Sequence, residues 1–423
     1  MSGPLAALVG RYRNDRLARS SVHLMVNNVV ATGLGFVAWI VTTRLWASSE
    51  VGDAAAAISA AGLAASLAML GVQGTLLRFV PSSTDARGLL GTAIAVTAPV
   101  AVVLGLCFGI WQSGGLSGGH SRVAALALFV ALVVALVLKS VVEAAVVAIR
   151  ATGAVIAANA SGNAAKIASV AVLGALSTGP LGIVVGTLVA ATTALVMLVR
   201  AAQVGDILAG PQHASVTVVR SLHRYSLTFY FNGLIGGIPA LALPILVRER
   251  LGSDAAAYWY IASLMALALF QLPAAVGTAL LVEGSHRRGE LLRLVLSAAR
   301  GLALVMLPVI VIAVIAAPWV LHLFGATYVD QSTSPFRIMA VSGLLVSASY
   351  LLGDVLFVRR RLGPLVALNV VNAVVVIGLA ARATSLDGVA WAWLVGEVAN
   401  VAMFAVLIPL FPERGKLPEE VTR

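Results

Sequence analysis

Long apolar runs, separated by short polar breaks, follow one another along almost the whole chain. A membrane-spanning helix needs roughly 20 predominantly apolar residues. The breaks contain Gly, Pro, Ser or charged residues, which are typical of turns. The pattern therefore predicts an all-α polytopic membrane protein with twelve transmembrane helices, at 22–43, 54–77, 89–111, 123–149, 154–176, 181–199, 225–247, 256–282, 294–317, 338–358, 363–381 and 388–411.

The composition supports this class of protein. Of the 423 residues, 60% are hydrophobic and only 11% are charged, whereas a soluble globular protein is about half apolar and about a quarter charged. A cytosolic enzyme, a disordered protein and a disulfide-stapled secreted domain are therefore excluded. The net charge is +11, but the basic residues stand singly between apolar runs. We therefore attribute the charge to membrane topology and expect no nucleic-acid partner.

The distribution of basic residues predicts the orientation of the chain. With the N-terminus inside, 20 of the 28 Lys and Arg residues fall on the inner side and six on the outer side, while Lys139 and Lys166 lie within spans. Basic residues accumulate on the cytoplasmic side of membrane proteins. We therefore expect a plasma-membrane protein whose basic segment 1–21 and tail 412–423 are both cytoplasmic. The longest connections between spans are expected at 200–224 and 318–337.

The two halves of the sequence resemble each other. The segments RLWASSEVGDAAA (44–56), GVQGTLLRF (71–79) and SSTDARGLL (82–90) correspond to RLGSDAAAYW (250–259), AVGTALLVEG (275–284) and SHRRGELL (285–292). Thr75 and Thr278 are 203 positions apart, and Gly88 and Gly289 are 201 apart. This near-constant offset predicts two six-helix lobes, 22–211 and 212–411. Because six is even, both lobes begin on the same side of the membrane, and the repeat is parallel with its axis along the membrane normal. This arrangement is typical of transporters.

The first helical hairpin resembles that of a known family. The hairpin contains RLWASSEVGD and LGVQGTLLRF, with Arg44, Glu50, Gly52, Gly71 and Arg78 at the matching positions. It resembles the polysaccharide (Wzx-type) flippases of the multidrug/oligosaccharidyl-lipid/polysaccharide exporter superfamily. The resemblance implies a monomeric transporter, not an enzyme, that works beside a polysaccharide polymerase. It would move a polyprenyl-diphosphate-linked oligosaccharide from the inner to the outer leaflet for cell-surface polysaccharide assembly, by alternating access of its two lobes around a central cavity.

Several ionisable and amide side chains fall near the membrane midplane in the fourth and fifth spans. Lys139 and Glu143 are four residues apart and so share one helix face, as do Asn159, Asn163 and Lys166. Counted from the turn near 150–153 at 1.5 Å per residue, both sets lie at the same depth. Such groups commonly face a cavity, where a lysine would meet a diphosphate or sugar hydroxyls. The alternative is a self-satisfied network in which Lys139 pairs with Glu143 and the asparagines bridge helices.

Two further carboxylates lie in the C-terminal spans. Glu397 and Asn400 are three residues apart in the last span, where they would bind a coupling cation or proton, or else form a structural hydrogen bond between helices. Asp354 is close in sequence to Arg359, Arg360 and Arg361, and we expect it to pair with them at the cytoplasmic interface.

Other polar residues lie on the helices that line the cavity in the resembled family, the first, second, seventh and eighth. Substrate contacts and plain hydrogen bonds between helices are equally open interpretations. Arg78 ends the second span at the inner face, where it would either meet a diphosphate headgroup or snorkel to the interface. The candidates in spans are Asn28, Asn232 and Gln271, besides Asn27 and Gln73.

The first span of each lobe contains candidate hinge residues. Proline removes a backbone hydrogen bond and kinks a helix, and a kinked helix would serve a rocking motion. Gly and Pro are also common in membrane helices without a hinge role. The candidates are Gly33 in the first lobe and Gly236, Gly237, Pro239 and Pro244 in the second.

Two other functions compete with the flippase hypothesis. One is a cation-coupled small-molecule or multidrug antiporter of the MATE or major-facilitator type, in which cavity carboxylates would be favoured over lysines. The other is a membrane glycosyltransferase or ligase, which would need an acid-bearing outer loop, and the outer loops here are short. The six histidines are scattered, with none paired at i, i+4, and no Walker lysine motif occurs. We therefore expect no metal site and no cofactor.

Overall fold

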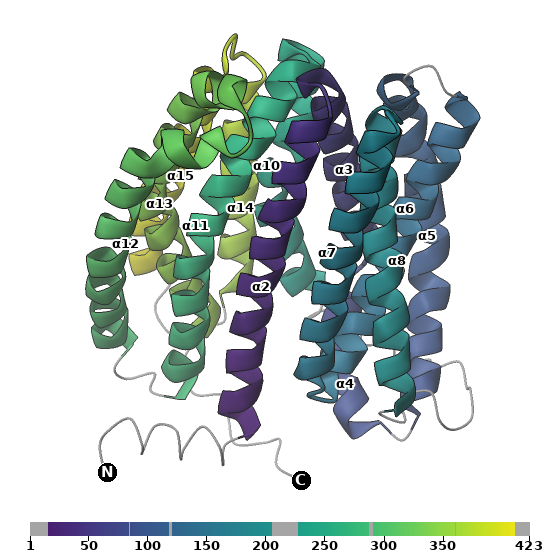
Figure 1. The fold of residues 1–423 in the computed structure, drawn as a ribbon. Coiled ribbons are helices and arrows are strands. Elements are labelled where there is room, and N and C mark those ends of the chain that lie inside the picture. The colour runs from purple at the N-terminus through teal and green to yellow at the C-terminus, as the bar shows by residue number, and fades with distance from the viewer. Residues whose placement is uncertain are drawn as a thin grey trace, which may run out of the picture. The chain divides into compact units, whose positions relative to one another are not determined.

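The computed structural model describes residues 16–83, 85–117, 121–204, 227–286, 291–359 and 361–410. Within these ranges the regular structure is entirely helical, as the apolar runs predict (Figure 1). Besides one 3-10 turn, η1 (Val80–Ser82), the α-helices are α2 (Arg16–Leu45), α3 (Ser48–Ala68), α4 (Val72–Phe79), α5 (Ala86–Leu116), α6 (Arg122–Ala148), α7 (Thr152–Ala175), α8 (Pro180–Val204), α10 (Leu227–Leu251), α11 (Ser253–His286), α12 (Leu291–His322), α13 (Ala326–Val358), α14 (Leu362–Ala380) and α15 (Leu386–Leu410).

Eleven of the described helices are long and apolar enough to cross a membrane. A twelfth, α7, has 24 residues, but its polar side chains Asn159, Asn163 and Lys166 make it less apolar than the others. Helices are favoured in a bilayer because they satisfy every backbone hydrogen bond within one segment. The predicted all-α membrane fold is confirmed, and each of the twelve predicted spans corresponds to helical structure.

The second predicted span is not one continuous helix, so the prediction of 54–77 is wrong in this respect. α3 ends at Ala68 and α4 begins at Val72. Between them Leu70 and Gly71 have φ values of 46° and 80°, a left-handed conformation that ends a helix. Glycine adopts it without a Cβ clash, which explains why Gly71 stands at the break.

The predicted connection 318–337 is also wrong. α12 continues to His322, α13 already begins at Ala326, and only a short turn separates them. Pro318 and Pro335 lie inside these helices. A proline removes the hydrogen bond to the carbonyl four residues earlier, which for Pro318 is that of Val314. The Arg337 Nε–H donates to the Val314 carbonyl oxygen at 3.1 Å, so a side chain of α13 satisfies it.

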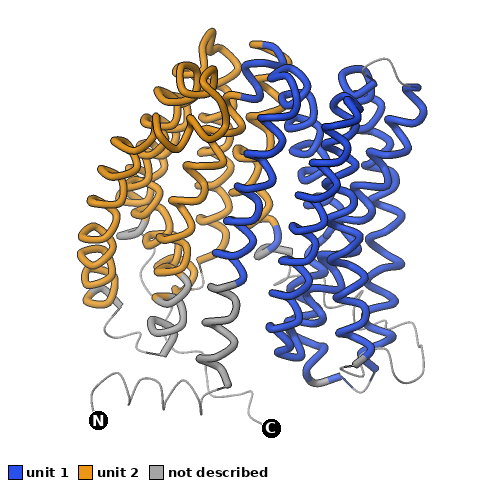
Figure 2. The backbone as a smooth tube through the Cα atoms, in the orientation of Figure 1, with its two compact units in different colours: residues 1–230, 252–257 blue, residues 231–251, 258–423 orange. Residues whose placement is uncertain are grey.

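The chain divides into two compact units, coloured separately in Figure 2. Unit 1 comprises residues 1–230 and 252–257, and unit 2 comprises 231–251 and 258–423. In unit 1, α5 packs on α6, α7 on α8, and α6 on α8. In unit 2, α12 packs on α13, α14 on α15, and α13 on α15. The third to sixth helices of each half therefore pair in the same way, as a parallel repeat requires.

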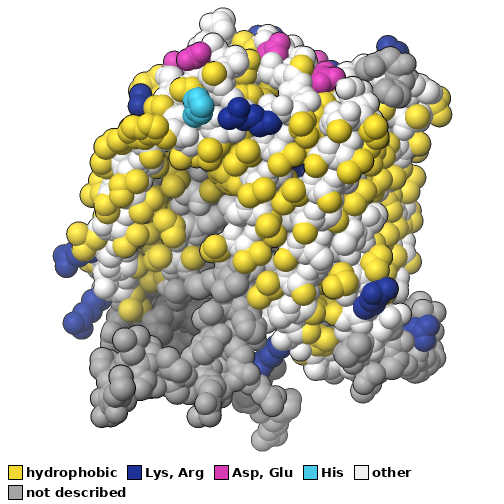
Figure 3. Space-filling view, in the orientation of Figure 1, with side chains coloured by type: hydrophobic (Ala, Val, Ile, Leu, Met, Phe, Trp, Pro, Cys, Tyr) yellow, Lys and Arg dark blue, Asp and Glu magenta, His cyan; other side chains and the backbone are white. Residues whose placement is uncertain are grey.

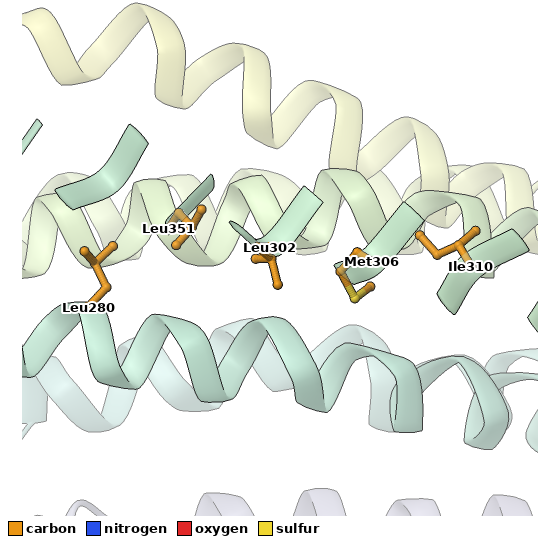
Figure 4. Close-up of a cluster of buried hydrophobic side chains, with 5 residues drawn as sticks. All are labelled: Leu280, Leu302, Met306, Ile310 and Leu351. Carbon is orange, nitrogen blue, oxygen red and sulfur yellow. The ribbon is translucent and has the colours of Figure 1, made fainter. Parts of the chain in front are cut away.

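The two units are packed with different side chains. In unit 1, α3 buries a run of alanines, including Ala54, Ala57 and Ala61, and such small residues let helices approach closely. Unit 2 has an aliphatic cluster that joins α11, α12 and α13, formed by Leu280, Leu302, Met306, Ile310 and Leu351 (Figure 4). Apolar side chains also cover much of the visible flank of the helices (Figure 3). Leu304 and Ile312 of α12 are among the exposed apolar residues.

Candidate functional site

The hairpin motif at the start of α3 is explained by local packing. Trp46 is buried, and its Nε1–H donates to the Gly179 carbonyl oxygen at 3.0 Å. The Glu50 carboxylate accepts a hydrogen bond from the Ala47 backbone N–H at 3.1 Å and so caps the first turn of α3. Gly52 lies directly against the Ser253 backbone, where a Cβ would clash. These motif residues therefore shape the hairpin.

A polar network in unit 1 joins α2, α6 and α7. The Lys139 ammonium forms an ion pair with Glu143 Oε2 at 2.8 Å. The Asn159 side-chain amide donates to Glu143 Oε1 and to Asn27 Oδ1, at 3.2 Å in each case. The two helices thus bring Glu143 and Asn159 to the same depth, and both oxygens of the carboxylate are occupied. We call Lys139, Glu143, Asn159 and Asn27 the unit 1 network.

Lys166 is separate from the unit 1 network. Its side chain is buried, with the residue only 8% exposed, and its Nζ lies 4.9 Å from the centroid of the Trp39 ring in α2. Within the described ranges Lys166 forms no ion pair with a carboxylate. An ammonium over an aromatic face gains a cation–π interaction, but its positive charge is not neutralised. Lys166 therefore contributes a net positive charge at the depth of the unit 1 network.

Asn163 does not extend this network between helices. Its side-chain amide donates to the Asn159 backbone carbonyl oxygen at 2.9 Å, within α7 itself.

Asn28 is exposed, whereas its neighbour Asn27 is buried and makes the contact with α7. Adjacent positions differ by about 100° around a helix, and packing decides which of the two faces inwards.

A second amide pair in unit 2 repeats that of unit 1. The Asn369 side-chain amide, on α14, donates to Asn232 Oδ1 on α10 at 2.8 Å. Asn159 and Asn27 lie on the corresponding helices of the first half. Gly236 packs against Asn369, which lies 3.6 Å from where a Cβ would stand. Among the sequence-predicted residues, Asn232 therefore has a defined interhelical partner.

Glu397 lies in a buried polar cluster of unit 2, which we call the Glu397 cluster. Its Oε2 accepts a hydrogen bond from Ser349 Oγ at 2.9 Å, and its Oε1 accepts one from the Asn372 amide at 3.4 Å. The Asn400 amide donates to Ser349 Oγ at 3.2 Å. The Oδ1 atoms of Asn372 and Asn400 are buried without a hydrogen-bond partner, so two acceptor oxygens remain unsatisfied beside the carboxylate.

Sequence reasoning missed Asn369, Asn372 and Ser349. Asn369 and Asn372 are three residues apart in the predicted span 363–381, so they share a helix face. The spacing argument that selected Glu397 and Asn400 would have identified them as well.

The expected pairing of Asp354 with Arg359 and Arg361 is not found, and pairing with Arg360 stays a prediction. In the described part of the chain, Asp354 forms no ion pair with Arg359 or Arg361, and Arg360 lies outside it. At about 100° per residue, Asp354 and Arg359 point some 140° apart around the helix. Asp354 instead faces Gly277 of α11.

The remaining candidates are members of neither polar cluster. Arg78 is exposed at the end of α4, and its guanidinium lies 5.5 Å from the centroid of the Phe79 ring. Gln271 is exposed on α11. Pro239 and Pro244 stand inside α10, which is assigned as one helix throughout. Gly33 and Gly237 have open space where a Cβ would stand.

No model of a protein family matches the sequence, and no curated protein matches it. Solved structures match over most of the chain. The lipid II flippase MurJ, in an inward closed conformation, covers 93% of this chain and 88% of its own, with a TM-score of 0.69 and 13% identity. An inward-facing multidrug resistance MATE family transporter of the MOP superfamily covers 91% and 98%, with a TM-score of 0.65 and 16% identity.

A third match is described as a MOP superfamily transporter from Pyrococcus furiosus with a binding pocket of reverse polarity. It covers 94% of this chain and 95% of its own, with a TM-score of 0.57 and 16% identity. At these identities the similarity establishes the fold alone. The chain therefore has the fold shared by the MATE-family transporters and MurJ, and the expected superfamily resemblance is confirmed at the level of fold.

Proposed function

We propose that this protein is a flippase that moves a polyprenyl-diphosphate-linked oligosaccharide from the inner to the outer leaflet. Three findings support the proposal: the fold shared with a lipid II flippase, the hairpin motif that resembles the Wzx-type flippases, and the charge of Lys166. The protein would act as a monomer in the plasma membrane with both termini cytoplasmic, beside a polysaccharide polymerase. The lobes 22–211 and 212–411 would alternate access, with Gly33, Gly236, Gly237, Pro239 and Pro244 as hinge residues.

The observation that carries the substrate assignment is the unneutralised charge of Lys166. A buried charge at membrane depth is costly and is commonly retained for function. Glu143 already neutralises Lys139 at 2.8 Å, so the unit 1 network alone carries no net charge. Lys166 adds one positive charge beside it, which suits a diphosphate. The amides of Asn159 and Asn163 would serve sugar hydroxyls. Arg78, Asn28, Asn232 and Gln271 would make further contacts with the substrate.

The Glu397 cluster would couple transport to an ion. A buried carboxylate with unsatisfied amide oxygens at Asn372 and Asn400 offers oxygen ligands for a proton or a hard cation. Ion binding there would bias unit 2 between two packings, since a ligand shifts an equilibrium by its differential affinity. If transport is coupled to a cation at this carboxylate, Glu397→Gln would abolish activity. If the protein is a purely downhill scramblase, Glu397→Gln would leave activity unchanged.

The test is a lipid extraction from a strain that lacks this gene, combined with an impermeant glycan-modifying reagent. We expect a polyprenyl-diphosphate-linked glycan to accumulate and to be shielded from the reagent. Complementation with the wild-type gene should restore access. Unchanged amount and exposure of lipid-linked glycans, in a strain without a second flippase, would contradict the proposal.

A cation-coupled small-molecule antiporter is the second candidate function. The observation that favours it is the buried carboxylate of Glu397, together with the fold shared with a multidrug resistance transporter. In that case the deletion strain would accumulate small organic cations, and Glu397→Gln would abolish their efflux. Lys166→Met would leave efflux unchanged, because a cationic substrate does not need a positive side chain.

A further inference from the structure

Asp354 is an ionisable side chain that the proposed mechanism does not use. It lies on α13, just before the helix ends at Val358, and its Oδ2 is buried without a hydrogen-bond partner. The residue as a whole is only partly buried, so the carboxyl group is not fully enclosed by the described side chains. A buried carboxylate oxygen without a donor is unfavourable while it carries charge.

The neighbouring helix approaches this carboxyl group closely. A Cβ at Gly277 of α11 would lie 2.5 Å from Asp354 Oδ2 and 3.8 Å from the Tyr350 Cβ. The contact is held in place by the aliphatic cluster of Figure 4, in which Leu280 of α11 and Leu351 of α13 pack together with α12. Asp354 therefore packs against the backbone of α11 at Gly277, where the absence of a Cβ leaves room for the carboxyl oxygen.

Among the side chains that the structure describes, which exclude 278–279 and 281–292, few charged or titratable groups lie around Asp354. Tyr350 lies one turn earlier on the same helix, and Glu397 of α15 is bonded to Ser349, the residue before it. α12 contributes Val295, which packs on Val355, and α14 contributes Leu365, which packs on Leu356. Neither Arg359 nor Arg361 pairs with Asp354. No cationic side chain of the described residues therefore neutralises it.

In unit 1, the corresponding helix has a carboxylate that is neutralised by a lysine of the same helix. α6 and α13 end at Ala148 and Val358, which are 210 positions apart. Glu143 and Asp354 are 211 apart, so Asp354 is displaced by one residue, which turns it by about 100° towards α11. Glu143 has Lys139 four residues before it and forms an ion pair at 2.8 Å. Asp354 has Tyr350 at that position, so the built-in cation of unit 1 is missing in unit 2.

We propose that Asp354 is a proton-binding site of unit 2, additional to Glu397. The carboxylate takes a proton from hydronium in the water at the adjacent end of α13, giving a neutral carboxylic acid and a water molecule. The acid returns the proton to water when the packing against Gly277 opens. A proton fits better than a metal cation at the contact with Gly277, because glycine itself has no side-chain oxygen to offer a metal. Proton binding at Asp354 does not depend on the proposed function. The use of this proton for coupling rests on the proposed function.

The test is infrared difference spectroscopy of the purified full chain in lipid vesicles, recorded as the pH is lowered at constant sodium. The carbonyl stretch of a protonated carboxylic acid reports the proton directly. We expect a pH-dependent band that is lost in Asp354→Asn and persists in Glu397→Gln. Tyr350→Lys should abolish the same band although Asp354 is still present, because the new ammonium copies Lys139 and holds the carboxylate charged. Tyr350→Phe, the matched control, should keep the band.

Two kinds of result would overturn the proposal. One is a wild-type spectrum without a band that depends on Asp354, or a band that Tyr350→Lys leaves unchanged in a folded protein. The other is a carboxylate signal that responds to sodium at constant pH and not to protons. The proposed function fails separately: a band that behaves as expected in a protein without flipping activity would leave the proton site intact and exclude the flippase.

Discussion

The side-chain amide of Asn369 donates a hydrogen bond to Asn232 Oδ1 at 2.8 Å and so joins α14 to α10. In the first half, Asn159 makes the same kind of contact with Asn27 at 3.2 Å, joining α7 to α2. Asn159 and Asn369 are 210 positions apart, the same offset that separates the ends of α6 and α13. The parallel repeat thus extends from the helix order to a specific pair of amides in each unit.

These amide pairs should stabilise their units measurably. Hydrogen bonds between membrane helices contribute about 0.6 kcal/mol on average and up to about 2 kcal/mol. We expect Asn159→Ala and Asn369→Ala each to lower the free energy of unfolding by about 1 kcal/mol, as measured by denaturant titration in detergent micelles. Asn28→Ala is the matched control, because Asn28 is exposed, and it should have little effect. An equal effect of all three variants would contradict the assignment.

The ion pair of the unit 1 network gives a second prediction. Lys139→Ala leaves the Glu143 carboxylate without its cation, whereas Lys139→Ala combined with Glu143→Gln removes both charges. Because each side chain remains about a quarter exposed, at 23% and 24%, we expect a loss of about 1–2 kcal/mol for the single variant, below the range for fully buried pairs. The double variant should recover part of this loss. A double variant less stable than the single one would show that Glu143 does not need Lys139.

A side chain at Gly277 should destabilise the protein while Asp354 is present. In Gly277→Ala the new Cβ would lie 2.5 Å from Asp354 Oδ2, and overpacking of this kind costs about 1–3 kcal/mol. Replacing Asp354 by alanine in the same chain should relieve most of the cost. Gly237→Ala is the control, since open space surrounds that position. Thermal unfolding of the four proteins checks the prediction, and a Gly277→Ala protein as stable as wild type would refute the close contact.

Arg337 should stabilise α12 through the carbonyl that Pro318 leaves free. Its guanidinium donates to the Val314 oxygen at 3.1 Å. We expect Arg337→Leu to destabilise the protein by about 1 kcal/mol, because the Val314 carbonyl loses its donor. Pro318→Ala restores a backbone donor and should make Arg337→Leu nearly neutral. If the two substitutions instead act independently, Arg337 does not satisfy this carbonyl.

The sequence predicts the spans well because a bilayer imposes their length and apolar character. It does not predict the break at Leu70 and Gly71, since an apolar stretch can be interrupted by backbone conformation without any change in polarity. It also fails at 318–337, where Pro318 and Pro335 are tolerated inside helices. Pro318 is tolerated because Arg337, a side chain of another helix, satisfies the carbonyl that the proline leaves free. A contact between two helices cannot be predicted from the sequence of one of them.

Within the candidate site, the sequence predicts how deep a residue lies along its helix more reliably than the direction in which its side chain points. It predicts that Glu143 and Asn159 lie at the same depth, and the hydrogen bond between them agrees with this. It does not distinguish Asn27 from Asn28, because packing decides which neighbour faces α7. The pairing expected for Asp354 fails for a similar reason: closeness in sequence to Arg359 does not mean a shared helix face.

The proposed function requires Lys166 to provide the positive charge for a diphosphate-linked substrate. The most direct measurement is transbilayer movement of a polyprenyl-diphosphate-linked glycan in vesicles containing the purified protein, comparing wild type with Lys166→Met and Lys166→Arg. We predict a loss of at least about tenfold in rate for Lys166→Met, which corresponds to about 1.4 kcal/mol, and substantial activity for Lys166→Arg, which keeps the charge. Equal rates in wild type and a folded Lys166→Met protein would contradict the account.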